Sequence, residues 1–178
     1  MPSKPIRLLI LLALATLAYP LHASDTYLAP DSFVSESFDG KPPKPRALWL
    51  SKSLQPDIKK ILGHDYPAAR VRYWRLGNRS TWILEEIGKT KPITTGIAIE
   101  DGKITRLRVL IYRESRGWEV KYPFFTDQFK ATQLDDKKRL SKKIDGISGA
   151  TLSVNALEKL SRLALYFHQA TTQKETDK

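Results

Sequence analysis

The sequence predicts an α+β protein: an antiparallel sheet with packed helices, including a long C-terminal helix. Two observations carry this prediction. Residues 93–100 and 104–112 are apolar segments on either side of Asp101-Gly102, a dipeptide that favours a two-residue hairpin turn. Residues 152–169 have apolar side chains at three- and four-residue spacing, which is typical of an amphipathic helix that packs on a sheet.

A helical lead-in is expected over residues 24–69. Its first helix should begin around Pro30, because proline suits the first helical turn, and apolar Phe33 and Phe38 recur along one side. Residues 46–51 have the character of a short strand. A second helix over 54–62 should end at Gly63, since glycine readily takes the left-handed conformation that ends many helices.

The strands of the sheet are expected over residues 70–112. Residues 70–75 alternate basic with apolar or aromatic side chains, and residues 81–88 follow the turn at Gly77-Asn78. In the last strand, Arg106 and Arg108 alternate with apolar residues. This alternation predicts a sheet with one face on the core and one face in solvent.

The domain organisation predicted is a signal peptide over 1–23, one domain over 24–170 with its sheet and C-terminal helix in 70–170, and a flexible tail over 171–178. Lys4 and Arg7 precede an apolar run over 8–18, and Pro20 breaks it before a small-residue cleavage site. The expected location is therefore the periplasm, with membrane association if the segment is kept as an anchor. The run is shorter than the ~20 residues of a membrane span.

Charge and composition narrow the chemistry. The formal net charge is +11, and loss of Lys4 and Arg7 leaves +9, which favours an acidic partner, an anionic membrane or a phosphate ligand. Nucleic acid is not expected, because the basic residues are scattered among acidic ones in an exported chain. No cysteine is present, and His64 and His168 lack partners at metal-ligand spacing, so neither a metal site nor a catalytic residue is assigned.

Residues 145–153 have the character of a phosphate-binding turn. Gly146 and Gly149 allow a tight turn, and the hydroxyls of Ser148 and Thr151 lie where the C-terminal helix is about to start. A helix N-terminus presents unpaired N–H groups and the positive end of the helix dipole, which together suit an anion. Most turns of this kind are only helix caps, so the chemistry alone leaves both interpretations open.

The sequence Asp-x-x-Ser-Gly-Ala-Thr-x-Ser at 145–153 resembles the flavinylation motif of the FMN-binding domain family. That family includes flavin-carrying components of sodium-translocating NADH:quinone reductase and of Rnf-type electron-transport complexes. In these proteins a flavin transferase, with FAD as donor, joins the phosphate of FMN to the threonine. The resemblance implies covalent FMN on Thr151, a flavin transferase as partner, and these further cofactor-binding residues: Asp145, Gly146, Ser148, Gly149, Ala150 and Ser153.

A second part of the site is expected between residues 114 and 129, where charges and aromatic residues share a loop. In the family, the corresponding position carries a Glu and a Gly-containing turn that lie against the flavin, of the type Glu-Thr-Pro-Gly-Leu-Gly. This chain matches it in position and character rather than in letters. The aromatic residues 118, 124, 125 and 129 have core packing as their alternative. The residues assigned to the cofactor here are Glu114, Arg116, Gly117, Trp118 and Glu119.

The expected function is that of an exported FMN-binding electron carrier, rather than a stand-alone enzyme, which exchanges electrons with periplasmic or membrane redox proteins. A positive charge from Arg116 or Lys121 would favour the anionic reduced flavin and raise its potential. Two alternatives stay open: a reductase that binds FMN without a covalent bond, and a basic, non-redox binding module of the cell envelope.

Overall fold

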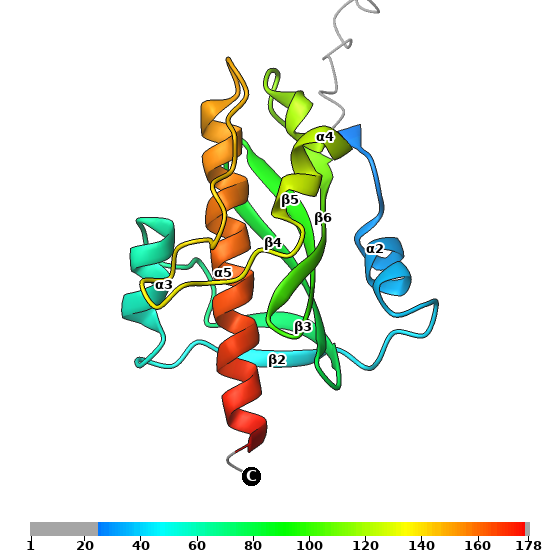
Figure 1. Cartoon of the computed structure of the whole chain (residues 1–178), viewed down its shortest axis with the longest axis vertical. Helices are drawn as coiled ribbons and strands as arrows, with labels where there is room; N and C mark the ends of the chain where they lie inside the picture. Colours follow the sequence, from blue (N-terminus) through cyan, green and yellow to red (C-terminus); the bar gives the residue numbers. More distant parts are fainter. Residues whose placement is uncertain (1–24, 177–178) are drawn as a thin grey trace, which may run out of the picture.

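The computed structural model describes residues 25–176 (Figure 1). The predicted signal peptide at 1–23 lies outside the described residues. Six antiparallel strands form one sheet in the order β1-β6-β5-β4-β3-β2. The strands are β1 (Asp25–Thr26), β2 (Arg46–Trp49), β3 (Arg70–Leu76), β4 (Arg79–Ile87), β5 (Pro92–Glu100) and β6 (Lys103–Tyr112). The helices are α2 (Pro30–Ser37), α3 (Gln55–Leu62), α4 (Pro123–Thr126) and α5 (Thr151–Thr176), with 3-10 turns η1 (Trp118–Lys121) and η2 (Asp127–Phe129).

The predicted α+β class, the hairpin at Asp101-Gly102 and the turn at Gly77-Asn78 are confirmed. Asp101 and Gly102 take φ values of 51° and 72°, the pair of positive values that a type I′ turn requires. Gly63 ends α3 in the left-handed conformation, as expected. The short strand expected at 46–51 is present as β2, and the lead-in also contributes β1; these two strands form the two edges of the sheet.

Helix α5 lies along one face of the sheet, and the main core lies between them (Figure 1). Leu157, Leu160 and Phe167 of α5 are fully buried there. Trp82 of β4 packs between Phe167 and the ring of Tyr73, on which it stacks with 4.8 Å between ring centroids. Helix α5 continues through Thr176, past the domain boundary predicted at residue 170.

The prediction of a solvated second face is wrong for the middle of the sheet. Helix α2 covers it, and the fully buried ring of Phe33 packs on Gly96, where an added Cβ would come within 2.6 Å of the ring. Arg106 lies over the same ring at 5.2 Å and pairs with Glu36 at 2.6 Å. The alternation in β6 is therefore real, but its polar side chains help to dock a helix from the lead-in.

No helix within residues 25–176 is both long enough and apolar enough to cross a membrane.

Candidate functional site

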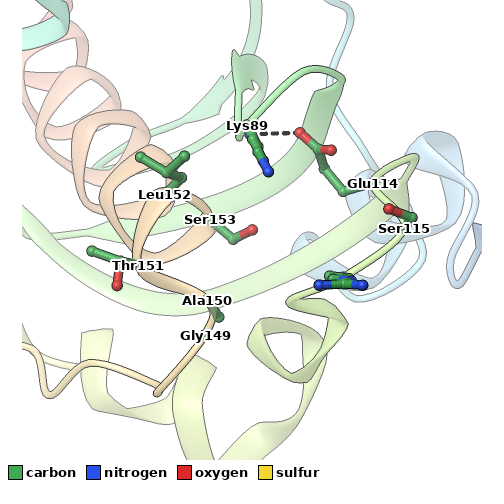
Figure 2. Close-up of a pocket in the computed structure, with 9 residues that line it drawn as sticks. Lys89, Glu114, Ser115, Gly149, Ala150, Thr151, Leu152 and Ser153 are labelled. Carbon is green, nitrogen blue, oxygen red and sulfur yellow. Dashed lines mark hydrogen bonds between the residues drawn. The ribbon is translucent and has the colours of Figure 1, made fainter.

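A cavity of about 620 Å³ lies at the N-terminus of α5 (Figure 2). Three segments that are distant in the sequence meet there: the β4–β5 turn, the segment after β6 and the start of α5. The lining residues are Lys89, Glu114, Ser115, Arg116, Gly149, Ala150, Thr151, Leu152 and Ser153. The two regions predicted to form one site are therefore side by side.

The start of α5 presents a hydroxyl and free backbone donors to this cavity. Gly149 turns the chain with φ 80°, and the first helical hydrogen bond runs from the N–H of Val154 to the carbonyl of Ala150, at 3.0 Å. The N–H groups of residues 151–153 consequently have no acceptor within the helix. Thr151 is exposed at the first position of the helix, where the helix dipole favours negative charge.

Tyr112 fastens the first turn of α5 to the end of β6. Its hydroxyl donates to the carbonyl of Arg116 at 2.6 Å and lies 2.9 Å from the hydroxyl of Ser153. Because the single phenolic proton is used on Arg116, Ser153 is the donor in the second bond. Burial raises the pKa of Tyr112, which keeps its phenol neutral.

Gly117 brings the loop directly against the helix. It has φ 79°, and an added Cβ would lie 3.1 Å from the Ser153 hydroxyl, 3.1 Å from that of Tyr112 and 3.2 Å from the Cβ of Ala150. Only glycine combines this backbone conformation with so close an approach. Gly117 thus packs against Ala150 and Ser153, which line the cavity, without lining it itself.

The carboxylate of Glu114 accepts hydrogen bonds from the turn between β4 and β5. Its Oε1 accepts the backbone N–H groups of Lys89, Thr90 and Lys91 at 2.5, 2.6 and 2.8 Å, and its Oε2 accepts the Thr90 hydroxyl at 3.1 Å. Burial tends to raise the pKa of Glu114, but these hydrogen bonds outweigh it and hold the pKa below its ordinary value. Glu114 therefore fixes the turn that carries Lys89 to the cavity (Figure 2).

Sequence reasoning missed Lys89, Ser115 and Leu152, which also line the cavity. Lys89 belongs to a polar turn that carries no motif, and only its link to a residue 25 positions later brings it to the site. Leu152 was assigned to the helix, but its side chain is exposed at the cavity.

The residues predicted to bind the cofactor fall into two groups. Those that line the cavity are Glu114, Arg116, Gly149, Ala150, Thr151 and Ser153; those outside its lining are Gly117, Trp118, Glu119, Asp145, Gly146 and Ser148. Asp145 is held by its backbone N–H, which donates to Gln128 at 2.8 Å. Trp118 is exposed in η1, whereas Phe125 and Phe129 are fully buried, so core packing accounts for those two aromatic residues.

The cavity suits a phosphate-bearing, partly apolar ligand. Its volume lies within the ~300–1,000 Å³ of ordinary ligand sites. The free N–H groups of α5, with Lys89 and Arg116, can offset the charge of a phosphate, and Leu152 supplies apolar surface. Within residues 25–176, no group of three His, Asp or Glu side chains is arranged to hold a metal ion.

The fold is that of NqrC, and the cavity lies at the N-terminus of helix α5. The solved structure of NqrC from Shewanella oneidensis matches with a TM-score of 0.55 and 15% sequence identity, over 77% of this chain and 88% of that one. At that identity the likeness establishes the fold. No curated protein sequence matches the chain.

Residues 88–166 match the model of the FMN-binding domain family, described as "FMN-binding domain". They include every residue that lines the cavity. The resemblance to this family that residues 145–153 predicted is therefore confirmed for this segment.

Proposed function

We propose that the protein is an electron carrier in which FMN is joined by a phosphoester to Thr151. The observation that carries the proposal is the exposed threonine at the first position of α5, in a cavity that also contains Lys89 and Arg116. In the attachment reaction, the threonine Oγ1 forms a bond to the FMN phosphorus of FAD. The pyrophosphate bond breaks, AMP leaves, and the hydroxyl proton goes to solvent or to a base of the transferase.

Several groups in the cavity have a role in this proposal. Lys89, Arg116 and the N–H groups of the first helical turn offset the phosphate charge. Ser153 is engaged with Tyr112, which leaves Thr151 as the hydroxyl available on this turn. When bound, FMN supplies the one- or two-electron redox chemistry, and the protein supplies attachment and electrostatics.

The proposed location is the periplasm, and residues 1–23 would direct export to it. The proposed partners are a flavin transferase and periplasmic or membrane redox proteins. The signal-like pattern of this segment supports export. A covalent bond suits an exported carrier, because a lost cofactor could not be replaced there. Fractionation of cells, followed by the intact mass of the protein in each fraction, tests export and cleavage together.

The test of attachment is the intact mass of protein made together with a flavin transferase. We expect an added mass of FMN minus water and a fluorescent band after denaturation. Thr151→Ala should lose both, whereas Ser115→Ala, which removes another hydroxyl of the same cavity, should keep both.

The other outcomes identify the alternatives. A yellow protein without added mass would mean that FMN binds non-covalently, as in a small reductase. A colourless protein of unmodified mass would favour a basic binding module without redox chemistry. Retention of the label in Thr151→Ala would place the attachment elsewhere.

A further inference from the structure

Four aromatic side chains are exposed together at one end of the molecule. We define this aromatic cluster as Tyr27, Trp118, Tyr122 and Phe124, with Lys121 among them; the aromatic side chains are 37%, 43%, 40% and 64% exposed. The ring centroids of Trp118 and Tyr122 are 5.7 Å apart, and those of Tyr122 and Phe124 are 6.3 Å apart. The cluster is therefore a continuous surface rather than scattered single residues.

Lys121 ties the cluster together. Its Nζ lies 3.9 Å from the centroid of the Tyr27 ring and 5.2 Å from the centroids of both Trp118 and Tyr122. The side chain thus contacts three exposed rings with its charged end. Trp, Tyr and Lys are the residues that proteins place at the boundary between lipid and water, where rings enter the headgroup layer and the ammonium group stays hydrated.

The aromatic residues that directly follow the cluster in the sequence are buried, so of the aromatic residues in this segment only those of the cluster itself are exposed. Phe125 and Phe129 follow Phe124 within five residues and are fully buried in the main core. Pro123 begins α4, and this short helix turns Phe125 inward while Phe124 remains outside. Contiguous apolar surface of this kind marks an interaction site in soluble domains.

The chain enters the fold beside this cluster. Asp25 and Thr26 form β1 and pair with Tyr112 and Ile111, so Tyr27 follows the first strand directly. Figure 1 shows β1 and α4 at the same end of the molecule. Six residues separate Asp25 from the apolar run that ends at Ala18, and six residues span at most about 20 Å. If the apolar run enters a bilayer during export, the surface of that bilayer lies within reach of the cluster.

We propose that the aromatic cluster docks the protein on the surface of an anionic phospholipid bilayer. The net charge, +11 for the full chain and +9 without Lys4 and Arg7, complements such a surface, and the position of Tyr27 relates the cluster to the N-terminal apolar run. Trp118 also follows Gly117, which packs against the cavity residues Ala150 and Ser153, so docking would hold the cavity near the membrane. The proposal does not depend on covalent attachment of FMN.

The experiment measures tryptophan quenching by lipid. The full chain is mixed with vesicles of phosphatidylcholine and phosphatidylglycerol, and tryptophan fluorescence is compared between brominated and unbrominated lipids. Trp118→Phe should lose most of the quenching. Trp49→Phe is the matched control, because Trp49 is also exposed but lies on β2 at the far edge of the sheet. This comparison isolates the cluster even if the N-terminal run itself holds the protein on the vesicles.

Two further variants sharpen the result. The double variant Tyr122→Ser/Phe124→Ser keeps Trp118 as the probe and should reduce its quenching at least severalfold; both side chains are exposed, and circular dichroism checks the fold. Lys121→Gln should lower the quenching on anionic vesicles by up to about fivefold and leave it unchanged on pure phosphatidylcholine.

Equal quenching of the wild type and Trp118→Phe, or no quenching at all, overturns the proposal. Loss of quenching with a concentration-dependent rise in molecular mass would instead assign the cluster to a contact between two copies. Absence of quenching together with saturable binding to a redox partner that Phe124→Ser abolishes would assign it to a protein interface.

Discussion

The hydroxyl of Ser153 lies 2.9 Å from the hydroxyl of Tyr112, and this buried contact joins the first turn of α5 to the end of β6. Tyr112 in turn donates to the carbonyl of Arg116, so one phenol connects the helix that carries Thr151 with the loop that carries Arg116. The geometry of the cavity therefore depends on a residue that does not line it.

Tyr112→Phe should destabilise the protein by about 1–3 kcal/mol, because it leaves the buried Ser153 hydroxyl and the Arg116 carbonyl without this partner. Urea unfolding measures the change. Tyr73→Phe is the control, since that ring keeps its stacking on Trp82, and it should cost clearly less. A loss no larger than in the control would mean that the contact contributes little.

Gly117→Ala should be more harmful than Gly102→Ala. Both glycines have positive φ, 79° and 72°, but an added Cβ at Gly117 meets Tyr112, Ala150 and Ser153, whereas at Gly102 it meets open space. The shared backbone strain costs about 1–2 kcal/mol, and crowding adds to it only at Gly117. The unfolding temperature and the yield of flavin attachment should both be lower for Gly117→Ala than for Gly102→Ala. Equal decreases in the two variants would mean that the loop at Gly117 shifts to accommodate the added Cβ.

Glu114→Gln should be tolerated far better than Glu114→Ala. The amide oxygen of glutamine can still accept N–H groups from residues 89–91, whereas alanine leaves all three without this acceptor. Hydrogen exchange at those three amides should accelerate strongly in the alanine variant only. Unchanged hydrogen exchange in the alanine variant would show that the turn at residues 89–91 is stable without the Glu114 carboxylate.

The lowered pKa of Glu114 adds a pH dependence to that result. A carboxylate with a depressed folded pKa stabilises the protein above the unfolded pKa near 4.5, and this contribution is lost as the pH falls through the folded value. The difference in stability between the wild type and Glu114→Gln should therefore shrink in acid.

Arg116→Ala should lower the midpoint potential of the attached flavin, on the order of 30 mV, the shift that a tenfold change produces in a two-electron couple. Removal of the cation disfavours the anionic reduced form. Lys121→Ala is the control: Lys121 lies over Tyr27 and outside the cavity lining, so its removal should leave the potential nearly unchanged. The reverse pattern would assign the tuning charge to Lys121.

His168 should make the protein less stable in mild acid. Burial, assisted by the charge of Arg75 and opposed by that of Asp101, lowers the pKa of His168 to about 4. The Trp82 indole donates to the Ser80 hydroxyl, whose oxygen lies 2.7 Å from Nδ1 of His168. The unfolded chain therefore binds more protons between pH ~6.5 and ~4, and about 3 kcal/mol of stability is lost across that interval.

His168→Asn keeps an acceptor and should flatten this pH dependence in urea unfolding. His64 should act with the opposite sign. Its hydrogen bond to the Asp65 carbonyl and its pairing with Glu86 raise the pKa of His64, so its stabilisation is complete below 6.5 and is lost as the pH rises through the raised value. His64→Asn should therefore lack the gain in stability that the wild type shows as the pH falls from the raised value to about 6.5, and it should keep the wild-type slope below that pH. Parallel curves for all three proteins over the whole range would refute both assignments.

The sequence was sufficient wherever local chemistry decides the structure. Pro30, Gly63 and Asp101-Gly102 predicted helix starts, helix ends and a hairpin, because each acts within its own turn. The motif at 145–153 located the start of α5 and one side of the cavity. These features need no knowledge of distant contacts.

The rest depends on contacts between distant segments. Phe33 packs on Gly96 only because α2 returns across the sheet, so the alternation in β6 could not reveal a covered second face. Lys89 reaches the cavity only because Glu114 binds its turn. The periodicity of a single segment reveals neither of these two contacts.

Helix α5 also provides a fixed distance for a spectroscopic measurement. It runs unbroken from Thr151 past the exposed Gln173, and 22 residues of helix span about 33 Å. Because the sequence contains no cysteine, a Gln173→Cys substitution would accept a single dye at a fixed distance from the proposed attachment point. The efficiency of energy transfer between that dye and the cofactor would then show, in intact cells or on vesicles, which molecules of the protein carry FMN and where they are located.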